Sequence, residues 1–498
     1  MYIMSRSKCK DIDAEAINSY GFSGTILMEN AANSIFEEIK STADSFLIIC
    51  GNGNNGGDGL AIGRKLLLDG KKVGFILVKP KDKSTDEFNT NLQIVKSICK
   101  DLLIVNEKSE LESIILYAQK YDIIIDSIFG TGLNRLLDSF YCSLISIINN
   151  LSKKIISVDV PSGLDSDTGR SLGNAIKADY TCTFEVIKKG FINYEAFKYL
   201  GKVKVISIGI PEKIKEDLNE KVYLVTDESN ETQIKSRSIF GHKGDYGRSV
   251  IVAGSYGYLG AARIATEACL SSGAGLTTLI TTDEGQKLLS PSIIEAMICS
   301  FDNIPKCNEL ISNADAVAFG PGIENSRESE ELLLRIIDNA AAKIIIDAEG
   351  INILSRRPEI VSRIPRDTIL TPHPGEMSRL INKPVEFVNE NRIEVSKEFA
   401  RKNKCIIVLK GYNTVITDGD SVYVNTSGNS KMASGGMGDA LTGIITALLS
   451  QGLKPLEAAV AAVFIHGKAG EAAGEGQYSI KASQLIDNIA FIMNKVTI

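Results

Sequence analysis

The sequence has few residues of the kind that bind zinc. It contains three histidines, His242, His373 and His466, and no Cys-X-X-Cys pair, and these are the usual sources of zinc ligands. Its nine cysteines are scattered, odd in number and mostly embedded in apolar runs. This distribution predicts buried free thiols in a reducing compartment, and it argues against a zinc centre or a disulfide framework.

Long apolar runs and long blocks of one charge are also absent. No stretch approaches the ~18 apolar residues that cross a bilayer, and the N-terminal residues lack the apolar core of a signal peptide. The net charge is −6, with acidic and basic residues interspersed. We therefore expect a cytoplasmic protein whose partners include neither nucleic acid nor membrane.

What the sequence does contain is a regular alternation of strands and helices. With 498 residues, 44% of them hydrophobic, it is too long for one ordinary core. Short β-branched runs alternate with helical stretches, which predicts α/β domains with parallel sheets and helices on both faces. A polar stretch between about 212 and 236 predicts a linker. We expect one domain over residues 1–212 and a second over residues 225–498.

Buried strands are predicted along both halves. In the first half they cover residues 46–50, 73–78, 121–128, 154–160 and 202–210. In the second they cover residues 249–255, 276–281, 315–323, 343–352, 367–377 and 405–411. The runs TVIT and SVYVN predict a hairpin, an antiparallel addition at the edge of the second sheet. Ligands bind at the carboxyl ends of such strands, so each domain should carry a site there.

The most informative motif is MASGGMGDALTG, at residues 432–443. Gly436 and Gly438 leave the backbone free to adopt positive φ, so successive N–H groups and a helix N-terminus can converge on an anion. Asp439 would stand beside that anion, where it can take a proton from a hydroxyl that attacks phosphorus. The alternative is a glycine-rich helix start that Asp merely caps.

In the first half, the strand at 46–50 runs into GNGNNGGDG. These glycines have the spacing of a dinucleotide fingerprint, but the next strand ends without an acid placed for a ribose, so a standard Rossmann cofactor site is not expected. Asn54, Asn55 and Asp58 bring oxygens that suit sugar hydroxyls or a hard cation. The alternative is that the asparagines tolerate the turn and Asp58 caps the helix.

Two more acids end strands in the first half, Asp126 in DSIFGTGL and Asp159 in SVDVPSGL. Carboxyl groups that meet at one sheet edge raise each other's pKa, which makes a carboxylate useful as acid or base near neutrality. A bound monovalent cation would relieve that repulsion. Taken singly, each Asp is also typical of a cap or a turn.

Both halves resemble known families. The runs YGFSGTILMENAA, GNGNNGGDGLAIGRKL, DSIFGTGL and SVDVPSGLDSDTG resemble NAD(P)H-hydrate epimerases, which implies a Rossmann-like N-terminal domain. The runs HKGDYGRSVIVAGS, FGPGI, DAEGIN, LTPHPGEMSRL, LKGYNT and GNSKMASGGMGDALTG resemble ADP-dependent NAD(P)H-hydrate dehydratases, which implies a ribokinase-like C-terminal domain. The resemblance covers nearly all of both halves, as three-layer αβα domains.

The resemblance implies repair of damaged cofactors by an isomerase joined to a lyase. NADH and NADPH take up water across a ring double bond and give R and S hydrates. The dehydratase uses ADP to phosphorylate the new hydroxyl of the S form, and loss of phosphate restores the ring, leaving AMP. The epimerase interconverts R and S. ADP, Mg²⁺ and K⁺ are implied as cofactors, and we expect a homo-oligomer.

The resemblance also assigns residues. In the second domain, Asp439 is the general base and a substrate contact, with further substrate contacts at Ala261, Gly322 and His373. The nucleotide and its phosphate fall to Lys410, Gly411, Tyr412, Asn413, Thr414, Gly436 and Gly438. In the first domain, the substrate contacts are Asn54, Asn55, Gly56, Gly57, Asp58, Gly130, Thr131, Gly132, Leu133, Asn134, Arg135, Leu136 and Asp159. The potassium ligands are Asn55, Asp126 and Ser162.

Three points stay open at this stage. The catalytic carboxyl of the first domain is Asp159 or Asp126, with Asp159 narrowly favoured. Met437 stands where the family commonly has serine, which removes a hydroxyl near the phosphate but keeps the backbone N–H. The rival interpretation is a vitamin-precursor kinase fused to a non-catalytic binding module. The runs LTPHPGEM and LKGYNT speak against the kinase, and the intact NNGGD loop speaks against the module.

Overall fold

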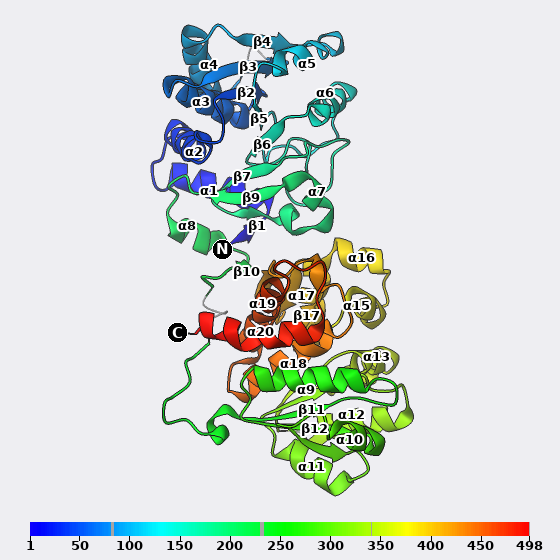
Figure 1. Cartoon of the computed structure of the whole chain (residues 1–498). Coiled ribbons are helices and arrows are strands. Elements are labelled where there is room, and N and C mark those ends of the chain that lie inside the picture. Colours follow the sequence, from blue (N-terminus) through cyan, green and yellow to red (C-terminus); the bar gives the residue numbers. More distant parts are fainter. Residues whose placement is uncertain (81–83, 230–233, 340, 498) are drawn as a thin grey trace. The chain divides into compact units, whose positions relative to one another are not determined.

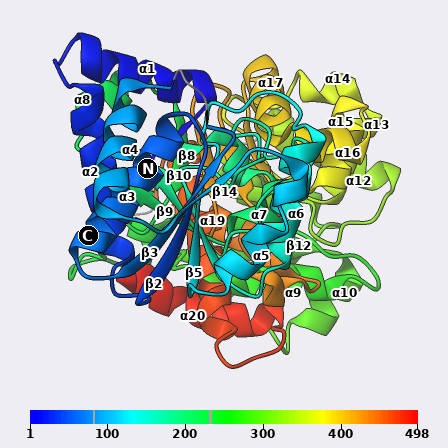
Figure 2. The same cartoon turned by 90° about the horizontal axis from the view of Figure 1, so that it is seen from above.

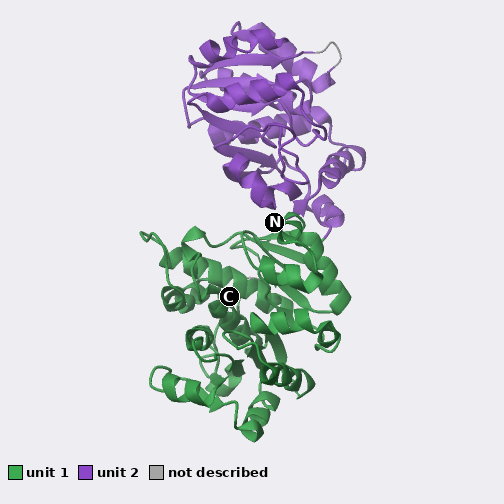
Figure 3. Cartoon of the chain, turned by 90° about the vertical axis from the view of Figure 1, so that its right-hand side faces the viewer, with its two compact units in different colours: residues 1, 221–498 green, residues 2–220 purple. Residues whose placement is uncertain are grey.

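The computed structural model of the chain describes residues 1–80, 84–229, 234–339 and 341–497. It divides into two compact units, a first of Tyr2–Glu220 and a second of Lys221–Ile498 together with Met1 (Figure 3). Both are built of alternating helices and strands (Figure 1). Within the described residues, no helix is both long enough and apolar enough to span a membrane.

The first unit is built on a parallel sheet of seven strands in the order β4-β3-β2-β5-β6-β7-β9. The strands are β2 (Ser45–Cys50), β3 (Lys72–Val78), β4 (Leu102–Val105), β5 (Ile123–Ser127), β6 (Lys154–Val158), β7 (Tyr180–Phe184) and β9 (Lys202–Ile206). The order reverses between β2 and β5, and at such a reversal the two following loops diverge and leave a crevice for a ligand.

Helices cover both faces of this sheet. They are α1 (Arg6–Asn18), α2 (Gly24–Ile39), α3 (Asn54–Leu68), α4 (Asp86–Ile98), α5 (Ser113–Ala118), α6 (Ser139–Asn150), α7 (Phe197–Leu200) and α8 (Glu212–Leu218). Alternate side chains of a strand point to opposite faces. Phe46 and Ile48 of β2 accordingly pack with α2, α3 and α4, whereas Leu47 and Ile49 pack with α5 and α6. Figure 2 shows α2, α3 and α4 on one side of β2 and α5 and α6 on the other.

The second unit has a sheet of ten strands in the order β10-β19-β18-β17-β16-β15-β14-β11-β12-β13. They are β10 (Val222–Val225), β11 (Arg248–Val252), β12 (Leu276–Thr281), β13 (Met297–Ser300), β14 (Ala316–Phe319), β15 (Lys343–Ile346), β16 (Ile369–Leu370), β17 (Ile406–Leu409), β18 (Thr414–Thr417) and β19 (Val422–Asn425). The pairs β17–β18 and β18–β19 are antiparallel and the other neighbours are parallel.

Helices also cover both faces of the second sheet. Its main apolar core joins one face to α9 (Leu259–Ser271), α18 (Met437–Ser450), α19 (Pro455–Ala473) and α20 (Ala482–Lys495). On the other face, Gly350 of α13 (Glu349–Arg356) lies against Ile346 and Phe319. The remaining helices are α10 (Asp283–Leu289), α11 (Ile304–Ser312), α12 (Arg327–Asn339), α14 (Pro358–Val361), α15 (Pro374–Ile381), α16 (Val385–Glu390) and α17 (Arg392–Asn403).

The structure corrects two expectations about the region after residue 212. The polar stretch predicted as a linker holds the helix α8 and the strand β10. The hairpin β18–β19 forms as predicted, but it does not lie at the edge of the sheet, because β10 pairs in parallel with β19 outside it. The strand β10 has only four residues, VYLV, in charged surroundings, so its run is too short to stand out as a strand in the sequence.

Candidate active sites

The glycine turn of the second unit opens the helix α18. Gly436 is its N-cap with φ 90°, and Asp439 lies in the first turn. A Cβ at Gly436 would lie 2.7 Å from Cδ1 of Ile264, and one at Gly438 would lie 3.3 Å from Nζ of Lys410. The turn therefore needs glycine. The backbone N–H groups at the N-terminus of α18 and the ammonium group of Lys410 lie close together at this turn.

Asp439 is a carboxyl whose pKa is raised to about 6. Burial is the main cause, the negative charge of Asp347 adds to it, and Lys410 opposes both. Burial disfavours the charged form of an acid, so such a group changes protonation close to neutral pH. Asp439 can therefore accept a proton near neutral pH and release it again readily.

Asp347 is the acid that orders this site, although the sequence assigned it no role. It follows β15 directly, its side chain is 2% exposed, and Nζ of Lys410 lies 2.8 Å from its Oδ1. The hydroxyl of Thr442 donates to its Oδ2 at 2.8 Å. Burial is the largest effect and opposes ionisation, but the charge of Lys410 and the hydrogen bonds from Lys410 and Thr442 together outweigh it and hold the pKa of Asp347 below its usual value. Its position directly after the aliphatic residues of a predicted strand, in the run DAEGIN, is the feature of the sequence that could have identified it as a candidate site residue.

His373 caps the helix α15. Its Nδ1 accepts from the Gly375 N–H at 3.0 Å, and the backbone N–H of His373 donates to Oε2 of Glu376 at 2.8 Å. Burial, together with the charges of Lys410 and Arg379, lowers the pKa of His373, so its ring is neutral at pH 7. Burial raises the pKa of Glu376 to about 7. The sequence singled out His373 but not Glu376.

The other predicted residues of this unit fall at the same sheet edge. A Cβ on Gly322, which follows β14 with φ 62°, would lie 3.0 Å from Cβ of Ala261. The run from Lys410 to Thr414 joins β17 to β18, with Gly411 at φ 136° and Asn413 at φ 53°. The Thr414 hydroxyl donates to Gly411 O at 3.1 Å, and Tyr412 is 44% exposed.

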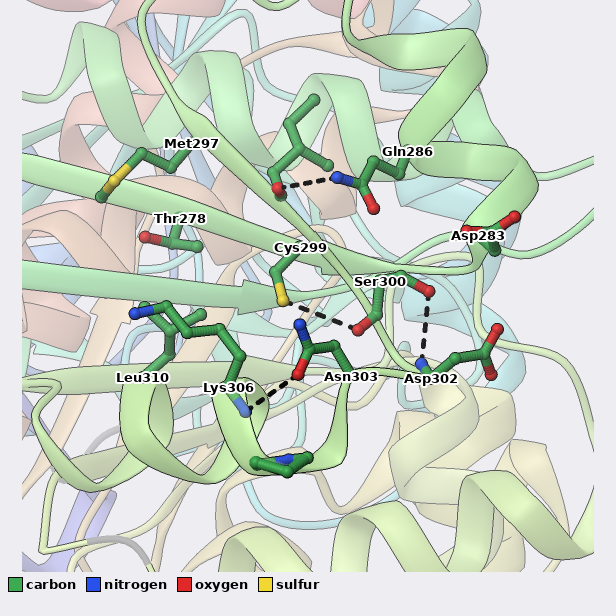
Figure 4. A pocket seen from close by; sticks show the side chains of 12 residues that line it. Thr278, Asp283, Gln286, Met297, Cys299, Ser300, Asp302, Asn303, Lys306 and Leu310 are labelled. Atoms are coloured by element: carbon green, nitrogen blue, oxygen red, sulfur yellow. Dashed lines mark hydrogen bonds between the residues drawn. The ribbon is translucent and has the colours of Figure 1, made fainter.

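A cavity of about 740 Å³ lies elsewhere on the second unit, between β12, β13, α10 and α11 (Figure 4). It is lined by Thr278, Asp283, Gln286, Met297, Ile298, Cys299, Ser300, Asp302, Asn303, Pro305, Lys306 and Leu310. None of these residues belongs to the cluster around Asp439, and β13 is the edge strand farthest along the sheet from β10. Size alone therefore does not identify the candidate site, because the carboxyls with shifted pKa values, Asp347, Glu376 and Asp439, lie outside this cavity.

In the first unit, the asparagine-rich loop opens α3. A Cβ at Gly56 would lie 2.0 Å from Gly51 O, so the loop needs glycine there. Nδ2 and Oδ1 of Asn55 are buried and have no hydrogen-bond partner among the described residues. A Cβ at Gly130 would lie 3.2 Å from Cγ of Asn55 and 3.1 Å from Oδ2 of Asp159. The loop at 130 thus closes directly over both side chains.

Asp126 and Asp159 have different surroundings. Asp126 is fully buried, and it accepts from the Ser162 hydroxyl at 2.5 Å, the Ser162 N–H at 2.8 Å and the Ser157 hydroxyl at 2.8 Å. Burial raises its pKa against the effect of these bonds. Asp159 instead lines a cavity of about 150 Å³, with φ 65°, and accepts from the Thr131 N–H at 3.2 Å.

The cavity gathers part of the predicted set. Asn54, Asp58, Thr131 and Asp159 line it, whereas Asn134, Arg135 and Leu136 are exposed and outside it. It also brings in residues that the sequence did not suggest, among them Lys188, whose Nζ lies 3.0 Å from Oδ1 of Asp159. In the described part of the chain, no group of three or more His, Cys, Asp or Glu side chains is arranged to hold a metal ion.

Comparison with known proteins decides the family. Residues 24–190 match the family described as YjeF-related protein N-terminus, and residues 249–490 match NAD(P)H-hydrate dehydratase. The bifunctional NAD(P)H-hydrate repair enzyme Nnr of Moorella thermoacetica is 34% identical over 100% of this chain and 97% of the relative. The chain belongs to the family of bifunctional NAD(P)H-hydrate repair enzymes. The Thermofilum pendens repair enzyme is 36% identical over 95% of this chain and 92% of its own.

Solved structures agree with this family and with the ribokinase-like fold. The ADP/ATP-dependent NAD(P)H-hydrate dehydratase from Bacillus subtilis, co-crystallized with ATP/Mg²⁺, is 31% identical, with a TM-score of 0.50, and covers 55% of this chain and 99% of its own. A ribokinase-like protein of Enterococcus faecalis V583 is 28% identical, with a TM-score of 0.53, and covers 56% and 97%. The predicted repair-enzyme family, α/β fold class and pairing of isomerase with lyase are confirmed.

Proposed function

We propose that the second unit dehydrates S NAD(P)H hydrate at the expense of ADP and that the first unit interconverts the R and S hydrates. The observation that carries the proposal is the cluster at the start of α18. There, a carboxyl with a pKa of about 6, a half-buried lysine and a glycine turn meet in a chain related over its whole length to repair enzymes. Residues 1–212 would hold the epimerase and residues 225–498 the dehydratase.

Asp439 begins the dehydration by taking the proton of the hydrate's hydroxyl. The oxygen then attacks the terminal phosphorus of ADP and AMP leaves. The N–H groups around Gly436 and Gly438, with the α18 N-terminus, would hold the transferring phosphate. The run from Lys410 to Thr414 would hold the rest of the nucleotide, and Ala261, Gly322 and His373 the substrate. The phosphate ester loses phosphate and a ring proton, which re-forms the double bond.

Lys410 has a double role in this proposal. Its Nζ is held by Asp347 at 2.8 Å and would meet any Cβ placed on Gly438, so it faces the phosphate turn. Burial lowers the pKa of Lys410, but Asp347 and Glu376 outweigh burial and raise it, which keeps the cation charged. Mg²⁺ would enter with ADP, because Mg²⁺ is usually held by substrate phosphates and one or two carboxylates.

The first unit fits a monovalent cation such as K⁺. Asn55 has a buried amide oxygen without a donor, which is the state expected of a cation ligand. Asp126 and Ser162, locked together at 2.5 Å, would complete the set with Asn55. The cation would neutralise the buried negative charge beside the substrate. Because Asp126 is enclosed and Asp159 faces the cavity, Asp159 is the better candidate for proton transfer.

Two proposals about the surroundings of the enzyme remain. A cytoplasmic location is supported by nine free cysteines, seven of them buried. Assembly into a homo-oligomer stays a prediction, which size-exclusion chromatography with light scattering checks.

The decisive experiment follows the return of reduced nicotinamide absorbance from a mixture of R and S NADH hydrates with ADP, Mg²⁺ and K⁺. We expect complete recovery. Recovery that stops once the S form is consumed would remove the epimerase half of the proposal. A lack of recovery with ADP or ATP, together with phosphorylation of a hydroxymethylpyrimidine, would favour the kinase interpretation instead.

A further inference from the structure

The N-terminal helix α1 contributes to the cavity of the first unit, although the matched family region begins only at residue 24. Four of its residues, Cys9, Ile12, Asp13 and Ile17, line the cavity together with Asp58, Asp159 and Lys188. Asp13 lies outside every motif that the sequence brought forward. Its place in the cavity calls for an explanation, because an acid that lines an active-site cavity has access to the substrate.

The helix α1 is fastened to the loops that carry the site. The short strand β1 (Ile3–Met4) pairs in parallel with β8 (Ile187–Lys188), so Met4 lies opposite Lys188. Arg6 then holds the loop that follows Asp159, with Nη2 at 2.6 Å from Asp165 and its backbone N–H at 2.7 Å from Asp167. Side chains of α1, α2 and α8 share a small apolar core.

The acids around the cavity are not equivalent. Asp159 has a cation, Lys188, whose side chain is only 3% exposed. The side chains of Asp13 and Asp58 form no ion pair or hydrogen bond with any described residue. Asp13 lies on the cavity wall and is in contact with solvent. The residues around it desolvate its carboxyl in part, and this desolvation, helped by the charge of Asp159, raises its pKa to about 6. Burial raises the pKa of Asp58 well above its usual value.

We propose that Asp13 is a second catalytic carboxyl of the epimerase, which exchanges water at the substrate together with the Asp159–Lys188 pair. This rests on the proposed epimerase function of the first unit. In the route proposed here, epimerisation removes a hydroxyl from one face of a ring carbon and returns one to the other face. Two proton-handling groups that reach one cavity from different elements, α1 and the end of β6, supply what that exchange needs.

The step balances as an exchange of water. Asp13 gives its proton to the hydroxyl, the C–O bond breaks, and the lone pair of the ring nitrogen forms a C=N⁺ bond. A solvent water adds to the opposite face of that carbon and passes its extra proton to Asp159. In the reverse direction the two carboxyls trade roles, as microscopic reversibility requires. Lys188 is a positioning residue, which holds Asp159 toward the cavity.

The test compares two aspartates of the same helix. Asp13→Asn and Asp11→Asn both remove a carboxyl from α1, but Asp11 is 51% exposed and pairs with Lys8 on the surface. Conversion of purified S hydrate to R hydrate is followed by chromatography without nucleotide, so the dehydratase is idle. We expect Asp13→Asn to lower kcat by roughly 100-fold or more with little change in KM. Asp11→Asn should match the unmodified chain.

The pH profile and the source of oxygen give independent readouts. The groups that face Asp13 are Cys9, Asp58, Asp159, Glu185 and Lys188. We expect a limb near pH 6 in the unmodified chain that Asp13→Asn removes and Asp13→Glu retains. In ¹⁸O-labelled water, the newly formed epimer should carry solvent oxygen.

Three results are distinguishable. Equal rates and pH profiles for Asp13→Asn and Asp11→Asn would overturn the role of Asp13. Retention of the original oxygen in the product would overturn the exchange of water. If the unmodified chain fails to interconvert the hydrates at all, the proposed epimerase function fails, whatever the variants do.

Discussion

Each unit holds a lysine against a carboxylate, and we propose different roles for the two pairs. In the second unit, Lys410 lies 2.8 Å from Asp347, while the proposed base, Asp439, has no cation of its own and a pKa raised to about 6. In the first unit, Lys188 lies 3.0 Å from Asp159, and Asp159 itself faces the cavity. We therefore propose that Asp347, which is enclosed, positions Lys410, whereas Asp159, which lines the cavity, takes part in proton transfer.

The largest effect that follows from this contrast is the loss of dehydration in Asp439→Asn. The amide cannot accept the hydroxyl proton, so we expect kcat to fall by roughly 10²- to 10⁴-fold. R–S interconversion should continue, because it belongs to the other unit. Nicotinamide absorbance with ADP gives the rate, and Asp487→Asn, an exposed acid on α20, is the matched control. Dehydration within tenfold of the control would exclude Asp439 as the base.

Replacing each lysine in turn should lower the free energy of unfolding by different amounts in the two units. In Lys410→Met, Asp347 keeps a buried charge without a partner, and we expect the free energy of unfolding to fall by about 3–5 kcal/mol. Lys188→Met should cost less, because water in the cavity can solvate Asp159. Proteolysis of each unit during a urea titration measures the two losses separately. Equal losses would show that the cavity does not solvate Asp159.

The sequence contains most of the fold. The eleven predicted strands are all found, because aliphatic runs buried on both faces leave a continuous apolar signal. The strands β1, β4, β7, β8, β10 and β13 were missed, and β1 and β8 have only two residues each. β7 reads YTCTF and is rich in threonine, while β4, β10 and β13 are four-residue edge strands, half open to solvent. These edge strands are apolar, LLIV, VYLV and MICS, but a run of only four residues cannot be told from part of a helix or a loop by its pattern.

The candidate sites were predictable only where chemistry sits in a motif. Asp439 and Asp159 lie in glycine-containing turns at the ends of strands or the starts of helices, and such turns are typical of ligand-binding sites. Asp13 and Lys188 lie outside the quoted motifs, and Glu376 lies in LTPHPGEMSRL beside the more prominent His373; only the folded chain brings them to a cavity or to a lysine. The choice between Asp126 and Asp159 also needed the structure, because it depends on which carboxyl the serines enclose.

The pH dependence of dehydration should show a limb near pH 6. Asp439 acts as a base only when ionised, and its pKa is raised to about 6. The rate should therefore be nearly full at pH 7 and about tenfold lower at pH 5, on the titration of a single group. Measurement of kcat/KM for S hydrate between pH 5 and 8 checks this. A flat profile down to pH 5 would place the pKa of the base near its unperturbed value.

The smallest effect concerns the space beside the glycine turn. In Gly438→Ala, the new methyl group would lie 3.3 Å from Nζ of Lys410 and force the lysine to shift slightly. We expect a cost of about 1 kcal/mol, which is about fivefold in kcat/KM for ADP. Gly435→Ala is the control, since nothing lies within 4 Å of its added Cβ. If both variants bind ADP normally, Lys410 is not held against the turn in solution.

The central claim is that the two units carry separate activities that meet only through the substrate. Its most direct test mixes equal amounts of Asp159→Asn and Asp439→Asn chains and supplies R and S NADH hydrates with ADP, Mg²⁺ and K⁺. Alone, the first variant should stop after the S form and the second should recover nothing. Together they should restore all of the reduced nicotinamide. A mixture that stops where Asp159→Asn alone stops would contradict the account.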